Sequence, residues 1–352
     1  MDGSPERLLV RDGLRSGLPI AIAIHSTTLG PALGGLRIWS YPRAGDGVRD
    51  ALRLARGMTL KAAAAGLDLG GGKGVICAPA EGLRDPRRRR AALLDFGDLV
   101  ESLGGAYITA EDVGATPQDI ATIAERTAHV TGLSAERGGS GDPSPFTALG
   151  VEAAMRACAE ARFGSPEIGE RTVAIVGLGH VGSHLARRLG AVGCELLVTD
   201  IDPAKRELAG ELGASWVAPE HATASKCDLL APCALGGGIS PHTLPELRCE
   251  VVCGAANNQL ADDSLAEDLA RRGVVYAPDF IANAGGLIHV AGEVLGYDEE
   301  RAIELADGIE ASMARVLAIA ESRDITPLAA AREIALARLD AAGSNASVPA
   351  AA

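Results

Sequence analysis

The sequence has little positive charge for its size and no long apolar run. Lysine and arginine total 33 against 46 aspartate and glutamate residues, and the net charge of −13 argues against nucleic acid or an anionic membrane as a partner. No apolar stretch reaches membrane-spanning length, and the first residues lack the apolar core of a secretion signal. The seven cysteines are odd in number and show no metal-ligand spacing. We therefore expect a cytoplasmic protein without a metal site, its cysteines reduced core thiols mostly inside apolar strands.

With 352 residues the chain is long enough for two domains, and its rhythm changes part-way along. Residues 20–24 alternate isoleucine with alanine, as in a strand with one buried face, and apolar spacing predicts a helix from about Val48 to Lys61. Residues 137–145 are rich in glycine and proline and form a candidate hinge. Beyond it, short apolar strands alternate with helical stretches, which indicates a parallel sheet covered by helices.

The last part of the chain is strongly helical. Thr326 followed by Pro327 predicts the start of a final helix, because threonine caps helices and proline suits their first position. From Ala342 onward the small residues predict a frayed tail.

A glycine-rich turn marks a dinucleotide site. Residues 177–182 read Gly-Leu-Gly-His-Val-Gly, follow an apolar strand at residues 172–176 and open a helical stretch, and a second strand ends at Asp200. The glycines let the backbone approach a pyrophosphate, the helix N-terminus stabilises its charge, and the acid binds ribose hydroxyls. Asp200 would repel a 2′-phosphate, so NAD is expected rather than NADP, although Lys205 and Arg206 lie close in sequence. The residues expected to bind the cofactor here are Gly177, Gly179, His180, Val181, Gly182 and Asp200.

Two lysines stand in unusual surroundings. Lys61 is followed by four alanines and a glycine, and Lys73 follows three glycines. A buried or half-buried lysine must find an anion or lose its proton. Most lysines point to water, and that would be the expectation for either one alone. Beside a nucleotide site, the pair suggests that one amine grips a carboxylate and the other does proton chemistry.

Six motifs carry a family resemblance, in order, from about Leu18 to Leu339. They are the two lysine segments and residues 29–35, 110–114, 254–259 and 283–286. Together they resemble the glutamate/leucine/phenylalanine/valine amino acid dehydrogenases, most closely the leucine, valine and phenylalanine branch. The resemblance implies reversible, NAD-dependent oxidative deamination of an L-amino acid to a 2-oxo acid and ammonia. It also implies a homo-oligomer built from dimers.

The resulting expectation is an α/β protein of two domains with a catalytic cleft between them. Residues 1–137 form an N-terminal α/β substrate domain, joined by the C-terminal helices at about 320–352. Residues 138–319 form a Rossmann-type NAD-binding domain with a parallel sheet.

The resemblance also assigns roles to single residues. Lys61 would hold the substrate carboxylate, Lys73 would be the catalytic lysine and Asp112 the catalytic aspartate. Burial and a second ammonium would keep Lys73 neutral, able to activate water, while Asp112 would hold the substrate amine. Alone, Asp112 would be read as a helix N-cap. The remaining assignments are Leu33, Gly34, Met58, Ala110, Asn258, Leu287 and Val290 for the substrate, and Thr147 and Asn257 for the cofactor. His289 matches no catalytic role and is expected to be a packed core residue.

The side-chain pocket is expected to be apolar. Glutamate-specific members carry a lysine where this chain has Leu33 and a serine where it has Val290, so glutamate would leave a buried charge unpaired. Ala110 narrows the pocket as in aliphatic-specific members, whereas residues 287–289 look more like the phenylalanine branch. Leucine and valine are favoured, and a phenylalanine-specific enzyme is the alternative. A 2-hydroxy acid dehydrogenase would need a histidine–arginine pair that no motif supplies, and a non-catalytic sensor of NAD or amino acid stays open.

Overall fold

The computed structural model describes residues 4–346, and the chain divides into two compact units. The first unit comprises the chain up to Asp142, residues 290–296 and the part from Ala335 onward. The second comprises residues 143–289 and 297–334. Helices α9 (Gly285–Leu295) and α12 (Pro327–Ala346) are each shared between the two units. The division follows Asp142, whereas the sequence analysis placed it after residue 137.

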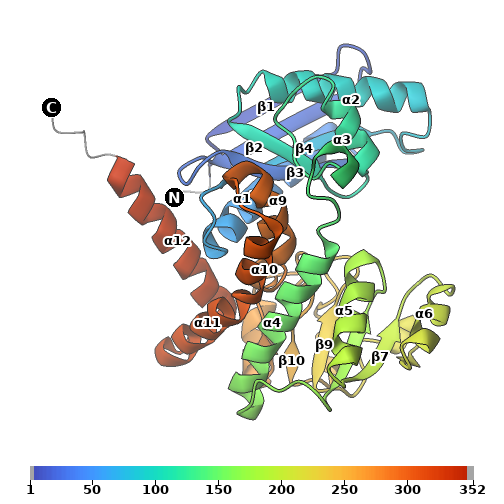
Figure 1. Cartoon of the computed structure of the whole chain (residues 1–352), viewed down its shortest axis with the longest axis vertical. Helices are drawn as coiled ribbons and strands as arrows, with labels where there is room; N and C mark the ends of the chain where they lie inside the picture. Colours follow the sequence, from blue (N-terminus) through green and yellow to red (C-terminus); the bar gives the residue numbers. More distant parts are fainter. Residues whose placement is uncertain (1–3, 347–352) are drawn as a thin grey trace. The chain divides into compact units, whose positions relative to one another are not determined.

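The first unit is built on a mixed sheet in the order β1-β2-β4-β3-β5 (Figure 1). Its strands are β1 (Arg7–Asp12), β2 (Pro19–Ser26), β3 (Ala32–Ser40), β4 (Gly70–Ala78) and β5 (Tyr107–Glu111). Strand β2 runs antiparallel to β1 and β4, whereas β3 runs parallel to β4 and β5. The helical elements of this unit are α1 (Ala44–Ala64), α2 (Pro86–Glu101), α3 (Pro117–Ile123) and a short 3-10 turn (Ala135–Arg137).

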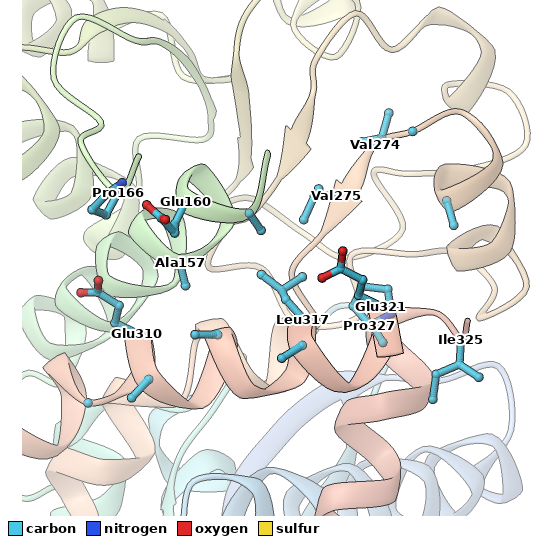
Figure 2. A pocket seen from close by; sticks show the side chains of 18 of the residues that line it. Ala157, Glu160, Pro166, Val274, Val275, Glu310, Leu317, Glu321, Ile325 and Pro327 are labelled. Carbon is cyan, nitrogen blue, oxygen red and sulfur yellow. The ribbon is translucent and has the colours of Figure 1, made fainter. Parts of the chain in front are cut away.

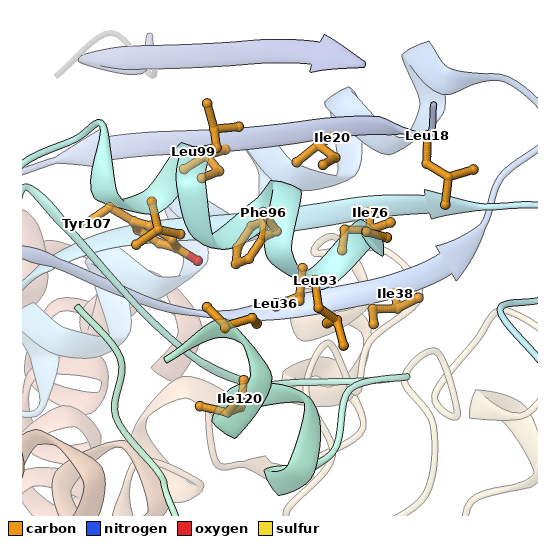
Figure 3. Close-up of a cluster of buried hydrophobic side chains, with 14 of the residues drawn as sticks. Leu18, Ile20, Leu36, Ile38, Ile76, Leu93, Phe96, Leu99, Tyr107 and Ile120 are labelled. Atoms are coloured by element: carbon orange, nitrogen blue, oxygen red, sulfur yellow. The ribbon is translucent and has the colours of Figure 1, made fainter. Parts of the chain in front are cut away.

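Helices cover both faces of this sheet. Helix α2 lies over one face, where Leu36, Ile76, Phe96 and Tyr107 belong to a buried apolar cluster (Figure 3). Helix α1 covers the opposite face, where alanines of α1 pack on small side chains of β2 and β4. The apolar periodicity from Val48 predicted α1, and the helix is confirmed.

Strand β2 differs from its prediction in burial. Ile20, Ile22 and Ile24 face the cluster beneath α2, as their alternation suggested. Ala21 and Ala23 are buried as well, beneath α1. The expectation of one buried face was therefore wrong, because alanine is small enough to let a helix lie directly on the strand.

The second unit contains a wholly parallel sheet in the order β11-β10-β9-β6-β7-β8. Its strands are β6 (Thr172–Val176), β7 (Glu195–Thr199), β8 (Ser215–Trp216), β9 (Leu229–Pro232), β10 (Val251–Val252) and β11 (Val275–Tyr276). The chain starts in the middle at β6, builds outward to β8 and then returns to build outward to β11. This is the doubly wound order of a Rossmann fold, and the predicted parallel sheet is confirmed.

Helices surround the second sheet as well (Figure 1). Helix α4 packs on α5, α10 and α11. The helices assigned wholly to this unit are α4 (Ser144–Phe163), α5 (His180–Ala191), α6 (Lys205–Glu211), α7 (Leu265–Arg271), α8 (Asp279–Ala282), α10 (Glu299–Asp307) and α11 (Ile309–Arg323), with 3-10 turns at Pro219–His221 and Leu244–Glu246.

The final helix begins where the sequence predicted. Thr326 caps α12, since its hydroxyl accepts a hydrogen bond from the Ala329 amide at 3.2 Å, and Pro327 is the first helical residue. The frayed tail predicted from Ala342 was wrong as far as Ala346, because the helix continues through these residues. The rest of that prediction lies outside the described residues.

The cysteines are free thiols, buried except for the half-buried Cys233. Among the described residues only Cys77 lies in a strand, so the prediction that most would do so was wrong. Strands such as β10 are very short, and the apolar segments around them, which hold Cys249 and Cys253, are loops. Within residues 4–346 no helix combines the length and apolarity required to cross a membrane.

Candidate functional site

The side chains of this unit that could take part in a reaction lie on one face of the first sheet. Side chains alternate between the two faces along a strand. On β3, Leu36 enters the cluster beneath α2, so Leu33 and Arg37 face α1. On β4, Val75 faces α1, and Lys73, two residues earlier, does the same. On β5, Tyr107 belongs to the cluster beneath α2, so Ala110 lies on the opposite face, and Asp112 follows the end of the strand directly.

Lys73 and Asp112 meet on this face. The Lys73 ammonium lies 3.0 Å from Oδ2 of Asp112, and the side chain of Lys73 is only 5% exposed. The same oxygen accepts a hydrogen bond from Nε of Arg37 at 2.9 Å. Arg37 also donates to Asp50 of α1 at 3.0 Å, and Asp50 accepts the Tyr41 hydroxyl at 2.7 Å. One connected, largely buried network therefore links Lys73, Asp112, Arg37, Asp50 and Tyr41.

Burial and charge set the protonation of this network. Burial lowers the pKa of Lys73 most strongly, Asp112 counteracts part of this shift and Arg37 lowers the pKa further, so the net shift is downward. Burial alone would raise the pKa of Asp112, but Lys73 and Arg37 outweigh it, so that pKa lies below its ordinary value. The sequence analysis expected Lys61 to supply the second positive charge, whereas the structure brings Arg37 against Asp112 and Lys73.

One of the glycines before Lys73, Gly71, makes room for helix α1. A Cβ atom on Gly71 would lie 2.0 Å from the backbone nitrogen of Thr59, so only glycine lets the helix come this close. Lys61 follows Thr59 by two residues, and Lys73 follows Gly71 by two residues. Lys61 is half-buried in the last turn of α1, and Met58, also half-buried, precedes Thr59.

The predicted substrate residues are distributed between the two units. Leu33 is buried on β3, and its neighbour Gly34 accepts the Tyr107 hydroxyl through its carbonyl at 2.5 Å. Ala110 is half-buried on β5. Val290 belongs to the first unit, and Leu287 and Asn258 belong to the second.

Thr131 ties Val290 to strand β5. The Thr131 amide donates to the carbonyl of Thr109 at 2.8 Å, and its buried hydroxyl donates to the carbonyl of Val290 at 3.0 Å. Because Thr109 directly precedes Ala110, this link brings helix α9 to the strand that carries Ala110.

The alternative reading of Asp112 as a helix cap does not match the structure. Helix α3 follows Asp112 but is capped by Thr116, which forms a reciprocal capping box with Asp119. The Asp112 carboxylate instead accepts from Arg37 and contacts Lys73.

The glycine-rich turn lies where a Rossmann sheet binds nucleotides. It follows β6 at the point where the strand order reverses between β6 and β9. A Cβ atom on Gly182 would lie 2.0 Å from the carbonyl oxygen of Gly177, which packs α5 tightly on the turn. A Cβ atom on Gly179 would meet nothing within 4 Å, so this part of the turn is open to a ligand.

The surroundings of the turn fit a dinucleotide. His180 and Val181 open α5, which has no side-chain cap, so its N-terminal amides are available to an anion. Asp200 follows the adjacent strand β7, and its Oδ2 accepts the amide of Leu178 at 2.7 Å. The acid therefore lies directly beside the turn, as ribose binding requires.

Further predicted cofactor residues lie near the carboxyl ends of the same sheet. Asn257 and Asn258 are exposed in the loop after β10, and the side-chain oxygen of Asn257 accepts the Asn283 amide at 2.9 Å. The Asn258 amide donates to Asp279. Thr147 lies in the first turn of α4, and Gly286 is close enough that a Cβ there would lie 2.4 Å from its hydroxyl.

His289 is a core residue. It is buried, and its ring stacks on Phe146 with the centroids 3.7 Å apart. The prediction that His289 packs in the core is confirmed.

The sequence analysis missed Arg37 and its partner Asp50. One signal was present, since Arg37 interrupts the apolar stretch of residues 36–39 at a position that shares a face with Leu33. What the sequence could not supply is the acceptor, since Asp112 lies 75 residues away.

A groove of about 1120 Å³ lies elsewhere in the second unit (Figure 2). Leu317 and Val275 contribute to its apolar wall, and Glu160, Glu310 and Glu321 are among its acids. Pro166 precedes β6 and Val275 begins β11, so the groove lies toward the amino ends of the strands, away from the glycine-rich turn. Among residues 4–346 no group of three or more histidine, cysteine or acidic side chains could hold a metal ion.

Family models match both parts of the chain. Residues 12–129 match the model described as Glu/Leu/Phe/Val dehydrogenase, dimerisation domain, and residues 198–346 match the glutamate/leucine/phenylalanine/valine dehydrogenase model. Residues 151–234 also match the NAD binding domain of D-isomer specific 2-hydroxyacid dehydrogenases. This last match covers only part of the second unit and includes the glycine-rich turn, which supports nicotinamide nucleotide binding.

Similar proteins cover nearly the whole chain. A leucine dehydrogenase from Thermoactinomyces intermedius is 45% identical over 338 residues, 95% of this chain and 91% of that protein. A valine dehydrogenase from Streptomyces coelicolor is 44% identical over 341 residues, 96% of this chain and 93% of that protein. The crystal structure of L-tryptophan dehydrogenase from Nostoc punctiforme superposes with a TM-score of 0.83 and 38% identity, covering 97% of this chain and 98% of that one.

Proposed function

The chain belongs to the glutamate/leucine/phenylalanine/valine dehydrogenase family, and from this premise we propose that it oxidatively deaminates an apolar L-amino acid, using NAD. The products are the 2-oxo acid and ammonia, and the reaction is reversible. The observation that carries the proposal is the buried contact between Lys73 and Asp112 at 3.0 Å. It pairs an amine whose lowered pKa favours its neutral, basic form with a carboxylate whose lowered pKa keeps it ionised and able to hold the substrate amine.

The residues of the first unit have separate tasks in this reaction. Lys61 binds the substrate carboxylate, and Asp112 holds the substrate amine. NAD, when bound, accepts the hydride from Cα of the amino acid. Neutral Lys73 then takes a proton from water, which attacks the iminium carbon, and Asp112 moves protons as the carbinolamine releases ammonia.

The second unit supplies the nucleotide site. The open glycine-rich turn and the uncapped start of α5 accommodate the pyrophosphate, with Gly177, Gly179, His180, Val181 and Gly182 along it. Asp200 binds the adenosine ribose and disfavours a 2′-phosphate, so NAD is preferred to NADP. Thr147 orients the nicotinamide amide, and Asn257 and Asn258 line the loop beside it.

The substrate side chain lies against apolar residues. Leu33, Ala110 and Val290 offer no charge to a γ-carboxylate, and Gly34, Met58 and Leu287 are further residues proposed to bind the substrate. Leucine and valine are therefore the favoured substrates, consistent with the 45% and 44% identity to leucine and valine dehydrogenases. An aromatic substrate such as phenylalanine is the second candidate, since one relative at 42% identity is an L-tryptophan dehydrogenase.

The proposal is tested by following NADH formation at alkaline pH. The substrates are L-leucine, L-valine, L-isoleucine, L-phenylalanine, L-tryptophan, L-glutamate and L-alanine, each with NAD and with NADP. We expect the highest kcat/KM with leucine or valine and with NAD. Best turnover with glutamate would contradict the assignment of Leu33, and best turnover with an aromatic substrate would favour the second candidate.

Lys73→Ala tests the role of the lysine in the same assay. It removes the amine that activates water, so turnover is lost, whereas NADH binding, measured by fluorescence titration, stays nearly unchanged. A near-normal rate in this variant would remove Lys73 from the mechanism. If folded wild-type protein binds NADH and leucine but turns over none of the amino acids, the chain is a sensor rather than an enzyme.

A further inference from the structure

Arg37 is the residue that links the Lys73–Asp112 pair to helix α1. Its Nε donates to Asp112 at 2.9 Å, and a second nitrogen of the same guanidinium donates to Asp50 at 3.0 Å. Arg37 is 19% exposed, and its two carboxylate partners are 18% and 16% exposed, so the arrangement is shielded from water. The planar guanidinium holds both carboxylates in defined directions, which a lysine could not do.

We propose that Arg37 is a positioning residue of this reaction: it holds the Asp112 carboxylate against Lys73 and, as a fixed cation, disfavours the positively charged form of the Lys73 amine. This inference rests on the proposed function. The contact with Asp112 has a geometric consequence, because Lys73 and Arg37 share a single carboxylate oxygen. Their nitrogens therefore lie within about 6 Å of each other, close enough for one charge to disfavour the other.

The sign of the effect follows from the charges around Lys73. Arg37 lowers the pKa of Lys73, whereas Asp112 and Asp50 raise it, and burial lowers it more than any of them. Loss of Arg37 therefore raises the pKa of Lys73, and the amine becomes neutral only at higher pH. Other titratable or charged groups on the elements packed around this face include His25 of β2, Tyr41 after β3, Asp46, Arg49, Arg53, Arg56 and Lys61 of α1, and Cys77 of β4.

The kinetic test compares pH profiles of kcat/KM for L-leucine. In the wild-type enzyme kcat/KM rises with pH as Lys73 loses its proton. In Arg37→Gln this rise moves to higher pH by about one unit, which is roughly a tenfold lower rate on the acidic limb. Arg37→Lys retains the positive charge but cannot form both hydrogen bonds, to Asp112 and to Asp50. The acidic limb of its pH profile therefore stays near that of the wild-type enzyme, while kcat falls. The KM for NAD is unchanged in both variants.

Arg53→Gln is the control. Arg53 lies on α1, the helix that also carries Asp50, and it donates to Asp50 at 2.8 Å while being 55% exposed. Its substitution therefore removes one positive charge beside Asp50 but leaves the contacts of Asp112 unchanged. Its pH profile matches that of the wild-type enzyme. If Arg37→Gln lowers kcat equally at every pH, Arg37 is only structural and the inference fails.

A second measurement separates this inference from the proposed activity. Competitive labelling of lysines with acetic anhydride, read by peptide mass spectrometry, reports the pH at which Lys73 becomes a neutral nucleophile. The midpoint rises in Arg37→Gln and stays near that of the wild-type protein in Arg37→Lys, whether or not the protein turns over an amino acid. An unchanged midpoint in folded Arg37→Gln overturns the inference even if leucine is a substrate. If Arg37→Gln does not fold, the inference is overturned by a raised midpoint of Lys73 labelling in Arg37→Lys, because that variant retains the positive charge.

Discussion

At the scale of single residues, the carboxylates near the proposed site each serve the fold as well as the chemistry. Asp112 is held by Arg37 and Lys73, and Asp200 accepts the amides of Leu178 at 2.7 Å and Asp202 at 2.9 Å. A substitution that removes only the charge therefore has a different effect from one that also removes the hydrogen-bond acceptor. Asp200 is the residue where the two can be separated.

Asp200→Asn retains an oxygen that can accept the Leu178 amide but removes the negative charge. We expect NADP to become a better cofactor, with the preference for NAD over NADP falling about tenfold or more, because a like-charge contact with the 2′-phosphate is relieved. Asp200→Ala also removes the acceptor, so the glycine-rich turn loosens and the KM for NAD rises as well. The measurement is kcat/KM with each cofactor at a saturating amino acid concentration. An unchanged cofactor ratio in Asp200→Asn would show that this charge does not set the preference.

At the scale of secondary-structure elements, the contact of α1 with β4 positions the substrate side of the site. Gly71 is needed by the helix, since the Thr59 backbone occupies the space beside it, whereas a Cβ atom on Gly70 or Gly72 would instead meet Ser26 or Tyr107. Displacement of α1 would move Met58 and Lys61 together. The contact therefore couples the stability of the first unit to amino acid binding.

Gly71→Ala tests this coupling. The added methyl would lie 2.0 Å from the Thr59 nitrogen, so the helix must shift. We expect a loss of about 1–3 kcal/mol in the free energy of unfolding and a rise in the KM for the amino acid larger than that for NAD.

Gly57→Ala is the matched control on the same helix. A Cβ there meets nothing within 4 Å, and alanine is favoured over glycine inside a helix by about 0.5–1 kcal/mol. Urea unfolding should therefore show equal or higher stability, with KM unchanged. Equal stabilities of Gly71→Ala and wild-type protein would mean that α1 can adjust without cost.

At the scale of the whole molecule, we expect self-association. Strand β1 is an edge of the first sheet, with Leu8 and Val10 exposed on it, and an unpaired apolar edge is normally covered. The family model that matches residues 12–129 is described as a dimerisation domain. Light scattering coupled to gel filtration should give an even multiple of the 35.9 kDa chain mass. A monomer or an odd number of subunits would contradict assembly from dimers.

Several features were predictable from sequence because their signals are contiguous. The glycine-rich turn with its flanking strand and helix, and the capped start at Pro327, each depend on residues that are close together in the sequence. The two lysine segments stood out for the same reason. The domain boundaries and the cytoplasmic location stay predictions.

The sequence by itself determined the parallel sheet and the position of the glycine-rich turn, since local periodicity and spacing record them directly, and the resemblance of its six motifs indicated the family. Only the tertiary structure decided that Arg37 accompanies Lys73 at Asp112. Arg37 and Asp112 meet because β3 and β5 pair in parallel with Leu36 opposite Glu111, so the next residue of each segment lies beside the other. Strand order and face are set by the packing of the whole unit, and no local pattern of residues encodes them.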